Sequence, residues 1–312
     1  MKSKYLIRTF DRNDWLFELD DGTECVHQLT LPIGPYEKNE MSDTIYHEGD
    51  SAAYHQHTDG FETFYIAKGC VEATIRSKRC VLTAGDMIHL VPNTPHGFVF
   101  LEEGTVWREL FQGINMAQGT INKNRIKNHY EGLYFQPEFR RRYLSLARNI
   151  NREPPVCEDT AKEALHEIRT PQFSYSTYRF GGIELRLKVG RWECGNIKEI
   201  WQANLNKGVR LSWDVPYGEW ELFYLTKGKI RFTILDEEFV AEPDCIVQIP
   251  PYCVHRMEVL EDAALFDYGC PVNLLALLED YTSISANDPQ RLQGEYKTSE
   301  FLLKYNCHIT SW

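Results

Sequence analysis

The sequence predicts an all-β-dominated protein with two tandem β-sandwiches or small barrels, a helical connector and short C-terminal helices. Three observations lead to this prediction. The 312 residues of the chain are about twice the length of a common domain. The chain contains an internal repeat. Short apolar runs, separated by Gly and Pro, recur at roughly ten-residue spacing, which is typical of sandwiches and barrels.

The internal repeat keeps one constant offset. Segment 62–69, Glu-Thr-Phe-Tyr-Ile-Ala-Lys-Gly, recurs as Glu-Leu-Phe-Tyr-Leu-Thr-Lys-Gly at 221–228, which is 159 positions later. The same offset relates three further identical pairs: Gly49 and Gly208, Pro92 and Pro251, and His96 and His255. Scattered identities at a single offset indicate a tandem duplication, in which each copy forms one domain.

Each copy contains short runs with strand character, whereas the segment between the copies differs. The expected strands include 64–66, 70–75 and 87–91 in the first copy and 222–225, 230–235 and 246–249 in the second. Helical spacing is found over 139–151 and 158–168, and 271–280 predicts a short helix after the second copy. We therefore expect an N-terminal barrel over 1–120, a helical connector over 121–172, a C-terminal barrel over 173–275 and an extension over 276–312.

Charge and composition exclude several classes of protein. The 45 acidic against 34 basic residues give a net charge of −11, which argues against a nucleic-acid-binding protein. The arginines within 139–152 are interpreted as the solvated face of a helix. Nine cysteines without a Cys-x-x-Cys pair argue against a thiolate metal site. No apolar run is long enough to span a membrane and no apolar leader opens the chain, so we expect a cytoplasmic protein.

Four residues of the first copy have the side chains of a metal site. His55 and His57 are two residues apart, so on a strand they project from the same face. Glu62 lies at the start of the next expected strand, and His96 lies at the end of the repeat. Both can reach the same interior point of an antiparallel barrel. Three imidazoles and one carboxylate suit one divalent Fe, Mn, Ni, Cu, Co or Zn ion.

The spacing of these residues resembles the two motifs of the cupin superfamily. The motifs read Gly49-x5-His55-x-His57-x4-Glu62-x6-Gly69 and Gly85-Asp86-x5-Pro92-Asn93-Thr94-Pro95-His96. Together with the duplication, they make the chain resemble a bicupin similar to the quercetin 2,3-dioxygenases. The resemblance implies two jelly-roll barrels and one metal ion, bound in the first barrel by the four residues described above.

The second copy departs from this pattern. The offset places Asp214 at the position of His55 and Pro216 at the position of His57, whereas Glu221 and His255 are retained. A proline side chain cannot ligate a metal. Asp214, Glu221 and His255 therefore form either a reduced second site or a site that has decayed and is retained for packing. The second interpretation is preferred, and a single metal ion per chain is expected.

The proposed centre predicts a class of chemistry but not one reaction. Four protein ligands leave about two positions of an octahedral metal open for water or a bidentate substrate. Glu62 is the candidate catalytic base if burial in the barrel raises its pKa. The resemblance implies a dioxygenase that cleaves an aromatic or enolic small molecule. A non-redox isomerase or lyase on a sugar-like substrate and a non-catalytic small-molecule-binding protein remain open.

The neighbouring residues distinguish these alternatives in part. Five aromatic residues on or beside the ligand strands form either an apolar substrate pocket or ordinary core: Tyr54, Phe64, Phe98, Phe100 and Trp107. A phosphosugar would instead require the nearby bases to converge, namely Lys68, Arg76, Lys78 and Arg79. His89 is a further candidate, interpreted as a structural histidine. The expected partner is a small molecule, and both a homodimer and a monomer are consistent with the sequence.

Overall fold

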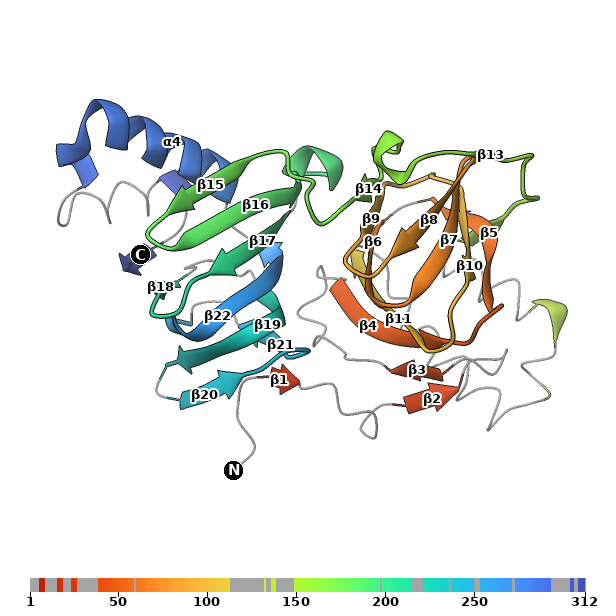
Figure 1. The fold of residues 1–312 in the computed structure, drawn as a ribbon, viewed down its shortest axis with the longest axis horizontal. Helices are drawn as coiled ribbons and strands as arrows, with labels where there is room; N and C mark the ends of the chain where they lie inside the picture. The colour runs from red at the N-terminus through yellow and green to blue at the C-terminus, as the bar shows by residue number, and fades with distance from the viewer. Residues whose placement is uncertain are drawn as a thin grey trace. The chain divides into compact units, whose positions relative to one another are not determined.

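The computed structural model confirms a β-dominated fold with two barrels (Figure 1). It describes residues 6–8, 16–18, 24–26, 39–58, 60–112, 132, 136–138, 149–196, 198–214, 221–235, 237–249, 253–270, 273–292, 304–305 and 308–311. Contacts divide the chain into two units. The N-terminal unit is Asp11–Phe173, and the C-terminal unit combines Met1–Phe10 with Ser174–Trp312.

The N-terminal unit is built from two antiparallel sheets. One sheet has the order β14-β9-β6-β11-β4-β3-β2, and the other has the order β12-β5-β10-β7-β8, with β13 added in parallel to β8. Their bounds are β2 (Leu16–Glu18), β3 (Glu24–Val26), β4 (Asn39–Tyr46), β5 (Ser51–His57), β6 (Phe61–Lys68), β7 (Cys70–Ile75), β8 (Lys78–Thr83), β9 (Met87–Leu90), β10 (His96–Phe100), β11 (Thr105–Gln112), β12 (Asn149–Asn151), β13 (Glu158–Asp159) and β14 (Ile168–Arg169).

The C-terminal unit repeats this architecture within one hydrogen-bonded sheet, whose main path is β1-β21-β19-β22-β17-β16-β15, with β18, β20 and β23 paired to its sides. Its elements are β1 (Leu6–Arg8), β15 (Thr177–Phe180), β16 (Ile183–Val189), η2 (Arg191–Glu193), β17 (Glu199–Leu205), β18 (Arg210–Asp214), β19 (Glu221–Ile234), β20 (Glu237–Ala241), β21 (Ile246–Ile249), β22 (His255–Cys270), α4 (Leu274–Asn287), η3 (Pro289–Leu292) and β23 (His308–Ser311).

Strand positions follow the sequence repeat. Strands β5, β6, β9 and β10 of the first copy begin at positions whose counterparts, 159 residues later, lie at or next to the starts of β18, β19, β21 and β22. The sequence therefore places corresponding strands in corresponding parts of both barrels. The duplication deduced from scattered identities extends to the order of the strands.

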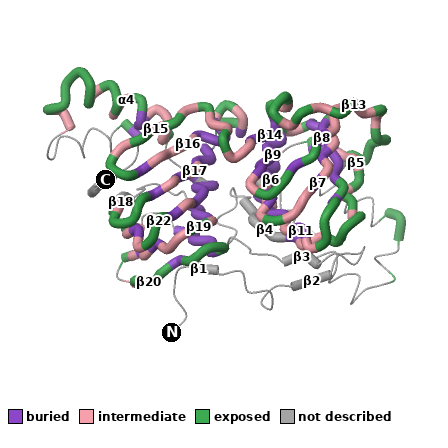
Figure 2. The backbone as a smooth tube through the Cα atoms, in the orientation of Figure 1, coloured by how far each residue is buried: buried purple, intermediate pink, exposed green. Residues whose placement is uncertain are grey.

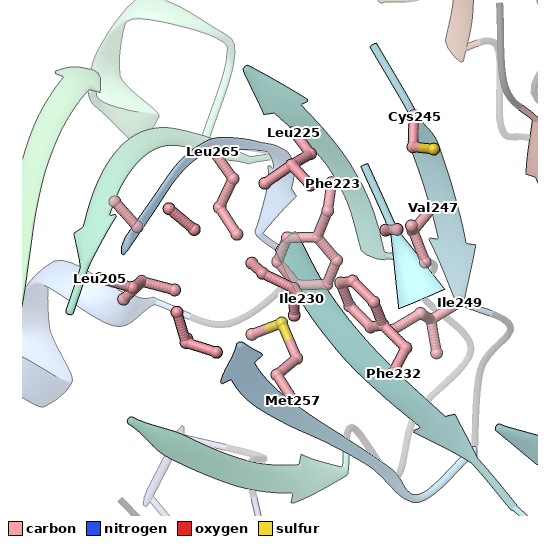
Figure 3. Close-up of a cluster of buried hydrophobic side chains, with 14 of the residues drawn as sticks. Leu205, Phe223, Leu225, Ile230, Phe232, Cys245, Val247, Ile249, Met257 and Leu265 are labelled. Atoms are coloured by element: carbon pink, nitrogen blue, oxygen red, sulfur yellow. The ribbon is translucent and has the colours of Figure 1, made fainter. Parts of the chain in front are cut away.

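Each barrel has its own apolar core (Figure 2). Alternate residues of the strands point inward. In the N-terminal unit the core includes Phe64, Ile66, Val71, Phe98 and Trp107. Figure 3 shows the corresponding cluster of the C-terminal unit, in which aromatic and branched side chains from β19, β21 and β22 interdigitate.

The connector differs from the sequence prediction. The helix expected over 158–168 is wrong: this segment forms β13, the short 3-10 turn η1 (Lys162–Ala164) and the start of β14. The reason is that strand pairing and ion pairs outweigh a weak helical periodicity. Most of the other expected helix, over 139–151, lies outside the described residues, and its last three residues form β12.

The helix expected at 271–280 is confirmed as α4. It begins after Asn273, whose side chain accepts a hydrogen bond from the Ala276 backbone amide, as an N-cap residue does. It is one turn longer than expected and ends at Asn287. Within the described part of the chain, no helix is long and apolar enough to cross a membrane.

One strand of each barrel comes from outside the copy that forms most of that barrel. Strand β1 opens the chain and pairs with β21 in the C-terminal unit, where Ile7 lies opposite Val247. Strand β14, which ends the connector, pairs in the same way with β9 in the N-terminal unit, where Ile168 lies opposite Ile88. Both strands end in Ile-Arg, and a threonine follows each of them in the sequence.

The hairpin glycines explain one of the repeated identities. Gly69 joins β6 to β7 with φ +92°, and a Cβ atom there would lie 2.3 Å from Thr105 Oγ1 and 2.9 Å from its Cα. Its counterpart Gly228 has φ +80°, and its Cβ would lie 2.3 Å from the Asp262 carbonyl oxygen. Glycine is therefore required at positions 69 and 228 for two reasons: the backbone is left-handed, and an adjacent segment of the backbone approaches closely.

We predict that Gly69→Ala destabilises the N-terminal barrel more than Gly49→Ala. Gly49 also has a positive φ (+89°), but no atom lies within 4 Å of its potential Cβ. The control should therefore lose only the left-handed backbone term, about 1–2 kcal/mol, whereas Gly69→Ala adds a steric clash. Urea unfolding of both variants measures the difference, and equal losses would contradict the close-approach argument.

Candidate metal centre

A β-bulge directs two histidines of β5 into the N-terminal barrel. Strand β5 pairs with β10, where His55 lies opposite His96 and Ala52 lies opposite Phe98. Three steps on β5 thus match two steps on β10, so β5 contains one extra residue. Because of this residue, Ala52 and His55 both face inward, and His57, two positions further, does so as well. Without the bulge, both histidines would point out of the barrel.

Glu62 and His96 reach the same point from the beginnings of two other strands. Glu62 is the second residue of β6, and His96 is the first residue of β10. The structure brings all four predicted residues together: one ligand atom from each of His55, His57, Glu62 and His96 lies within 4.8 Å of the others. Three of the four are buried, and His55 is partly exposed.

Backbone contacts orient two of the imidazoles. Nδ1 of His55 lies 2.6 Å from the Ala53 carbonyl oxygen, and Nδ1 of His96 lies 2.9 Å from the Thr94 carbonyl oxygen. A carbonyl only accepts hydrogen bonds, so each Nδ1 carries the proton and donates it. In the neutral ring, Nε2 then presents a lone pair to the centre of the cluster, as it does in a metal-binding histidine.

The lone pair of His96 is buried against another acceptor. Its Nε2 lies 3.4 Å from Glu62 Oε2 and makes no hydrogen bond to the described residues. Nε2 of His57 lies 2.9 Å from Glu62 Oε1, and Nε2 of His55 lies 3.2 Å from that of His57. The His96 lone pair and the carboxylate repel one another in an apolar interior. A cation between them would satisfy all four ligands.

The pKa shifts keep these groups in the forms that bind a metal. Burial lowers the pKa of His55 to about 4, and the nearby His96 contributes in the same direction. Burial also lowers the pKa of His96. Both imidazoles are therefore neutral near pH 7. Burial alone would raise the pKa of Glu62, but the hydrogen bond with His57 and the three adjacent imidazoles lower it overall.

The pKa of Glu62 corrects one expectation from the sequence. The sequence makes Glu62 a candidate base on the condition that burial raises its pKa, and the condition is not met because the pKa of Glu62 is lowered. The hydrogen bond from His57 is a contact that residue spacing does not reveal. Glu62 is thus suited to remain an anionic ligand, and its role as a catalytic base stays a proposal.

Aromatic side chains form the floor beneath the cluster. The rings of Phe98 and Phe64 have centroids 5.5 Å and 6.3 Å from that of His96, and Trp107 lies 4.7 Å from each phenylalanine. Phe100 packs on the far side of Trp107 and stacks on Tyr46. All four aromatic residues belong to the apolar core, and Phe64 and Phe98 are the two whose rings lie next to His96.

Two candidates face away from the cluster. The hydroxyl of Tyr54, on β5, donates a 2.6 Å hydrogen bond to the Arg76 carbonyl oxygen. His89 is buried on β9 and lies opposite Thr63, whose hydroxyl is 2.9 Å from its Nδ1. Because Thr63 alternates with the inward-facing Glu62 and Phe64, His89 lies on the outer side of the sheet. This position agrees with the interpretation of His89 as a structural histidine and not a catalytic one.

Three of the four bases near the first barrel are paired with acidic residues. Arg76 pairs with Glu167, Lys78 with Glu158, and Arg79 with Asp159 at 2.7 Å. The three acidic partners belong to the connector. These bases therefore hold the connector against the barrel rather than forming a phosphate-binding patch.

The sequence analysis missed a residue next to the cluster. The edge strand β12 pairs with β5, and Asn151 lies opposite His55. Directly paired residues share a face of a sheet, with their Cβ atoms about 5 Å apart. His55 is the ligand with partial exposure, so the exposed Asn151 lies beside the solvent-facing side of the cluster. No spacing rule links position 151 to the motif, because a long connector segment separates them.

The second barrel retains half of this arrangement. His255 Nε2 lies 3.0 Å from Glu221 Oε2, and His255 Nδ1 donates to the Cys253 carbonyl oxygen at 3.0 Å. The backbone of Asp214 ends β18, but its side chain and the whole of Pro216 lie outside the described residues. Leu277 and Leu278 of α4 pack on the inward-facing residues Trp201 and Cys270.

Comparisons with known proteins agree with the fold. Residues 43–106 match the Cupin domain family. An oxalate decarboxylase variant from Bacillus subtilis is similar in structure, with a TM-score of 0.55 and 14% identity over 96% of this chain and 87% of that chain. The oxalate decarboxylase from Lactobacillus farciminis gives a TM-score of 0.55 and 13% identity over 96% and 97%.

A dioxygenase has a similar fold as well. The salicylate 1,2-dioxygenase from Pseudaminobacter salicylatoxidans gives a TM-score of 0.55 and 9% identity over 77% of this chain and 73% of that chain. No curated protein matches the sequence. Likenesses at such low identity establish the two-barrel fold and leave the reaction open.

We predict that His255→Gln changes stability and leaves metal content unaltered. The buried His255–Glu221 pair lacks the imidazoles that correspond to His55 and His57, so its loss should weaken packing without removing a bound ion. Metal analysis of the purified variant and its thermal unfolding measure the two effects. A fall in metal content at unchanged stability would instead reveal an ion in the second barrel.

Proposed function

We propose that the N-terminal barrel, in which residues 43–106 match the Cupin domain family, is a metal-dependent dioxygenase centre. His55, His57, Glu62 and His96 would hold one divalent transition metal. The substrate would be an aromatic or enolic small molecule that offers two oxygen atoms. This proposal keeps the metal identity open among Fe, Mn, Ni, Cu, Co and Zn, because three nitrogens and one carboxylate suit each of them.

One observation supports metal binding most strongly. The buried Nε2 atom of His96 lies 3.4 Å from a carboxylate oxygen, and its Nδ1 proton is already donated to Thr94. An acceptor facing an acceptor in an apolar interior costs free energy unless a cation or proton lies between them. A divalent ion satisfies this pair together with His55 and His57.

The residues around the centre support an aromatic or enolic substrate. When bound, the metal would supply Lewis acidity for the substrate oxygens and, if redox-active, a place for O2 to react. Phe64 and Phe98 fill the inward positions next to Glu62 and His96, so the floor carries no positive charge. A planar conjugated substrate can pack on these rings, and their apolar surface excludes water.

A sugar phosphate fits the residues around the proposed centre less well. Arg76, Lys78 and Arg79 are paired with acidic residues of the connector, so they do not offer a phosphate site. The isomerase alternative on a phosphorylated sugar therefore has no support from these side chains.

A decarboxylase is the second candidate. Oxalate decarboxylases are similar over 96% of this chain, and Mn(II) centres are described for the enzyme from Bacillus subtilis. The same ligand set could hold a small carboxylic acid and release CO2 without net oxidation. A protein that binds the small molecule without turnover is the remaining outcome, and the experiments below distinguish the three.

We predict that His57→Ala removes most of the metal from the purified protein. Loss of one of four ligands leaves an incomplete site, and the buried Glu62 loses its hydrogen-bonding partner. Plasma mass spectrometry on the wild type and the variant measures the metal per chain. His47→Ala is the matched control, because His47 is exposed and pairs with Glu103. Equal metal content in all three proteins would contradict the assigned ligands.

We also predict substrate-dependent consumption of O2 by the metal-loaded wild type and none by His57→Ala. An oxygen electrode with salicylate-like, catechol, flavonol and diketone compounds provides the screen. Oxalate under strict anaerobiosis, with CO2 as the measured product, tests the second candidate. Anaerobic turnover would replace the dioxygenase with a lyase, and ligand binding without turnover would leave a binding protein.

A further inference from the structure

The C-terminal barrel has a cavity on its outer face, across β18, β22 and β19. Its volume is about 450 Å³, and three arginines contribute to its lining: Arg210, Arg231 and Arg256. Arg256 points outward, because it alternates on β22 with the buried residues His255 and Met257. Three cations in one cavity are unusual in a chain with a net charge of −11. Their partners therefore decide what the cavity can bind.

Strand register arranges the lining into two rows. In the first row, Glu258 lies opposite Arg210 on one side and Arg231 on the other. In the second row, Arg256 lies opposite Ser212 on β18 and Thr233 on β19. Positions that pair directly share a face of the sheet. The second row thus places a guanidinium group between two hydroxyl-bearing residues.

The first row is neutralised by its own acid. Glu258 accepts hydrogen bonds of 2.6 Å from Arg210 and from Arg231, one on each carboxylate oxygen. The hydrogen bond from Arg210 is the main reason why the pKa of Glu258 is lowered. Arg231 also lies 3.1 Å from Glu238. Both arginines are therefore held in fixed positions by carboxylates.

Arg256 differs from these two arginines. It makes no ion pair or hydrogen bond within the described part of the chain, although Glu258 lies only two residues away on the same strand. A guanidinium group offers a planar set of N–H donors that matches two oxygens of a carboxylate or a phosphate. The hydroxyl group of Thr233 is a further donor of the kind that binds such oxygens.

We propose that the row formed by Ser212, Arg256 and Thr233 binds a small oxyanion, namely the carboxylate or phosphate group of a metabolite. Arg256 supplies the charge and two parallel hydrogen bonds, and Thr233 supplies a third. The paired arginines of the first row fix the wall of the cavity, so the uncompensated positive charge is that of Arg256. The site uses none of the metal-binding residues and does not depend on the proposed function.

Isothermal titration calorimetry of the full-length protein tests this proposal. Inorganic phosphate and succinate are titrated separately at low ionic strength, so that the two sources of the oxyanion are distinguished. We expect one of them to bind, and Arg256→Gln to weaken this binding at least about tenfold, as expected for loss of a charge-assisted hydrogen bond. Thr233→Val, which keeps the shape of the side chain, should weaken it by a smaller factor.

Arg179→Gln is the matched control. Arg179 is an exposed arginine of the same unit that pairs with Glu184, so its loss changes the net charge by the same amount. Unchanged binding in this variant, together with weakened binding in Arg256→Gln, supports a specific site. Equal weakening in both variants, or no binding of either anion by the wild type, would overturn the proposal. Thermal unfolding establishes that the variants remain folded.

Discussion

The buried carboxylate of Glu62 is the constraint on which the first barrel depends. Glu62 is only 4% exposed and lies beside the apolar core, where an ionised carboxylate without partners costs several kcal/mol. Imidazoles from two other strands surround it, and the hydrogen bond from His57 both stabilises the charge and connects β5 with β6. The bulge in β5 follows from the same requirement, because it turns His55 and His57 toward the carboxylate. The chemistry of the centre and the local geometry of the strands therefore have one cause.

The second barrel shows what remains when half of this arrangement is lost. Glu221 and His255 keep the contact that Glu62 makes with His96, and the imidazole is again oriented by a carbonyl two residues earlier. In this barrel the pair lacks the two further imidazoles that His55 and His57 add in the first barrel. Leucines of α4 then pack on inward-facing side chains of this barrel. The two copies thus share one scaffold and one histidine–glutamate contact, and the first copy adds His55 and His57 to that contact.

Much of this could be predicted from the sequence, because its repeat and its ligand spacing depend on local rules. One offset placed the strands of both barrels, and the alternation of a strand put His55 and His57 on one face. The remaining features depend on pairings that are distant in sequence. Segment 158–168 has helical periodicity, yet Glu158 and Asp159 pair with Lys78 and Arg79 and form a strand. Asn151 lies opposite His55 for the same kind of reason. The lowered pKa of Glu62 likewise depends on a hydrogen bond from His57, which residue spacing does not reveal.

The connector has a larger role than a link between two barrels. Its acidic residues neutralise the bases of the first barrel, its strand β12 extends the edge beside His55, and its strand β14 completes the other sheet next to β9. The Ile-Arg-Thr tripeptide recurs where β1 completes the second barrel. Each barrel therefore needs a strand from outside its own copy, and the two copies are tied together by chain connectivity. Because β12 borders the ligand strand, the connector also determines which side chains surround the partly exposed side of the metal centre. Divergence of the connector would thus change the surroundings of the four proposed ligands without changing the ligands themselves.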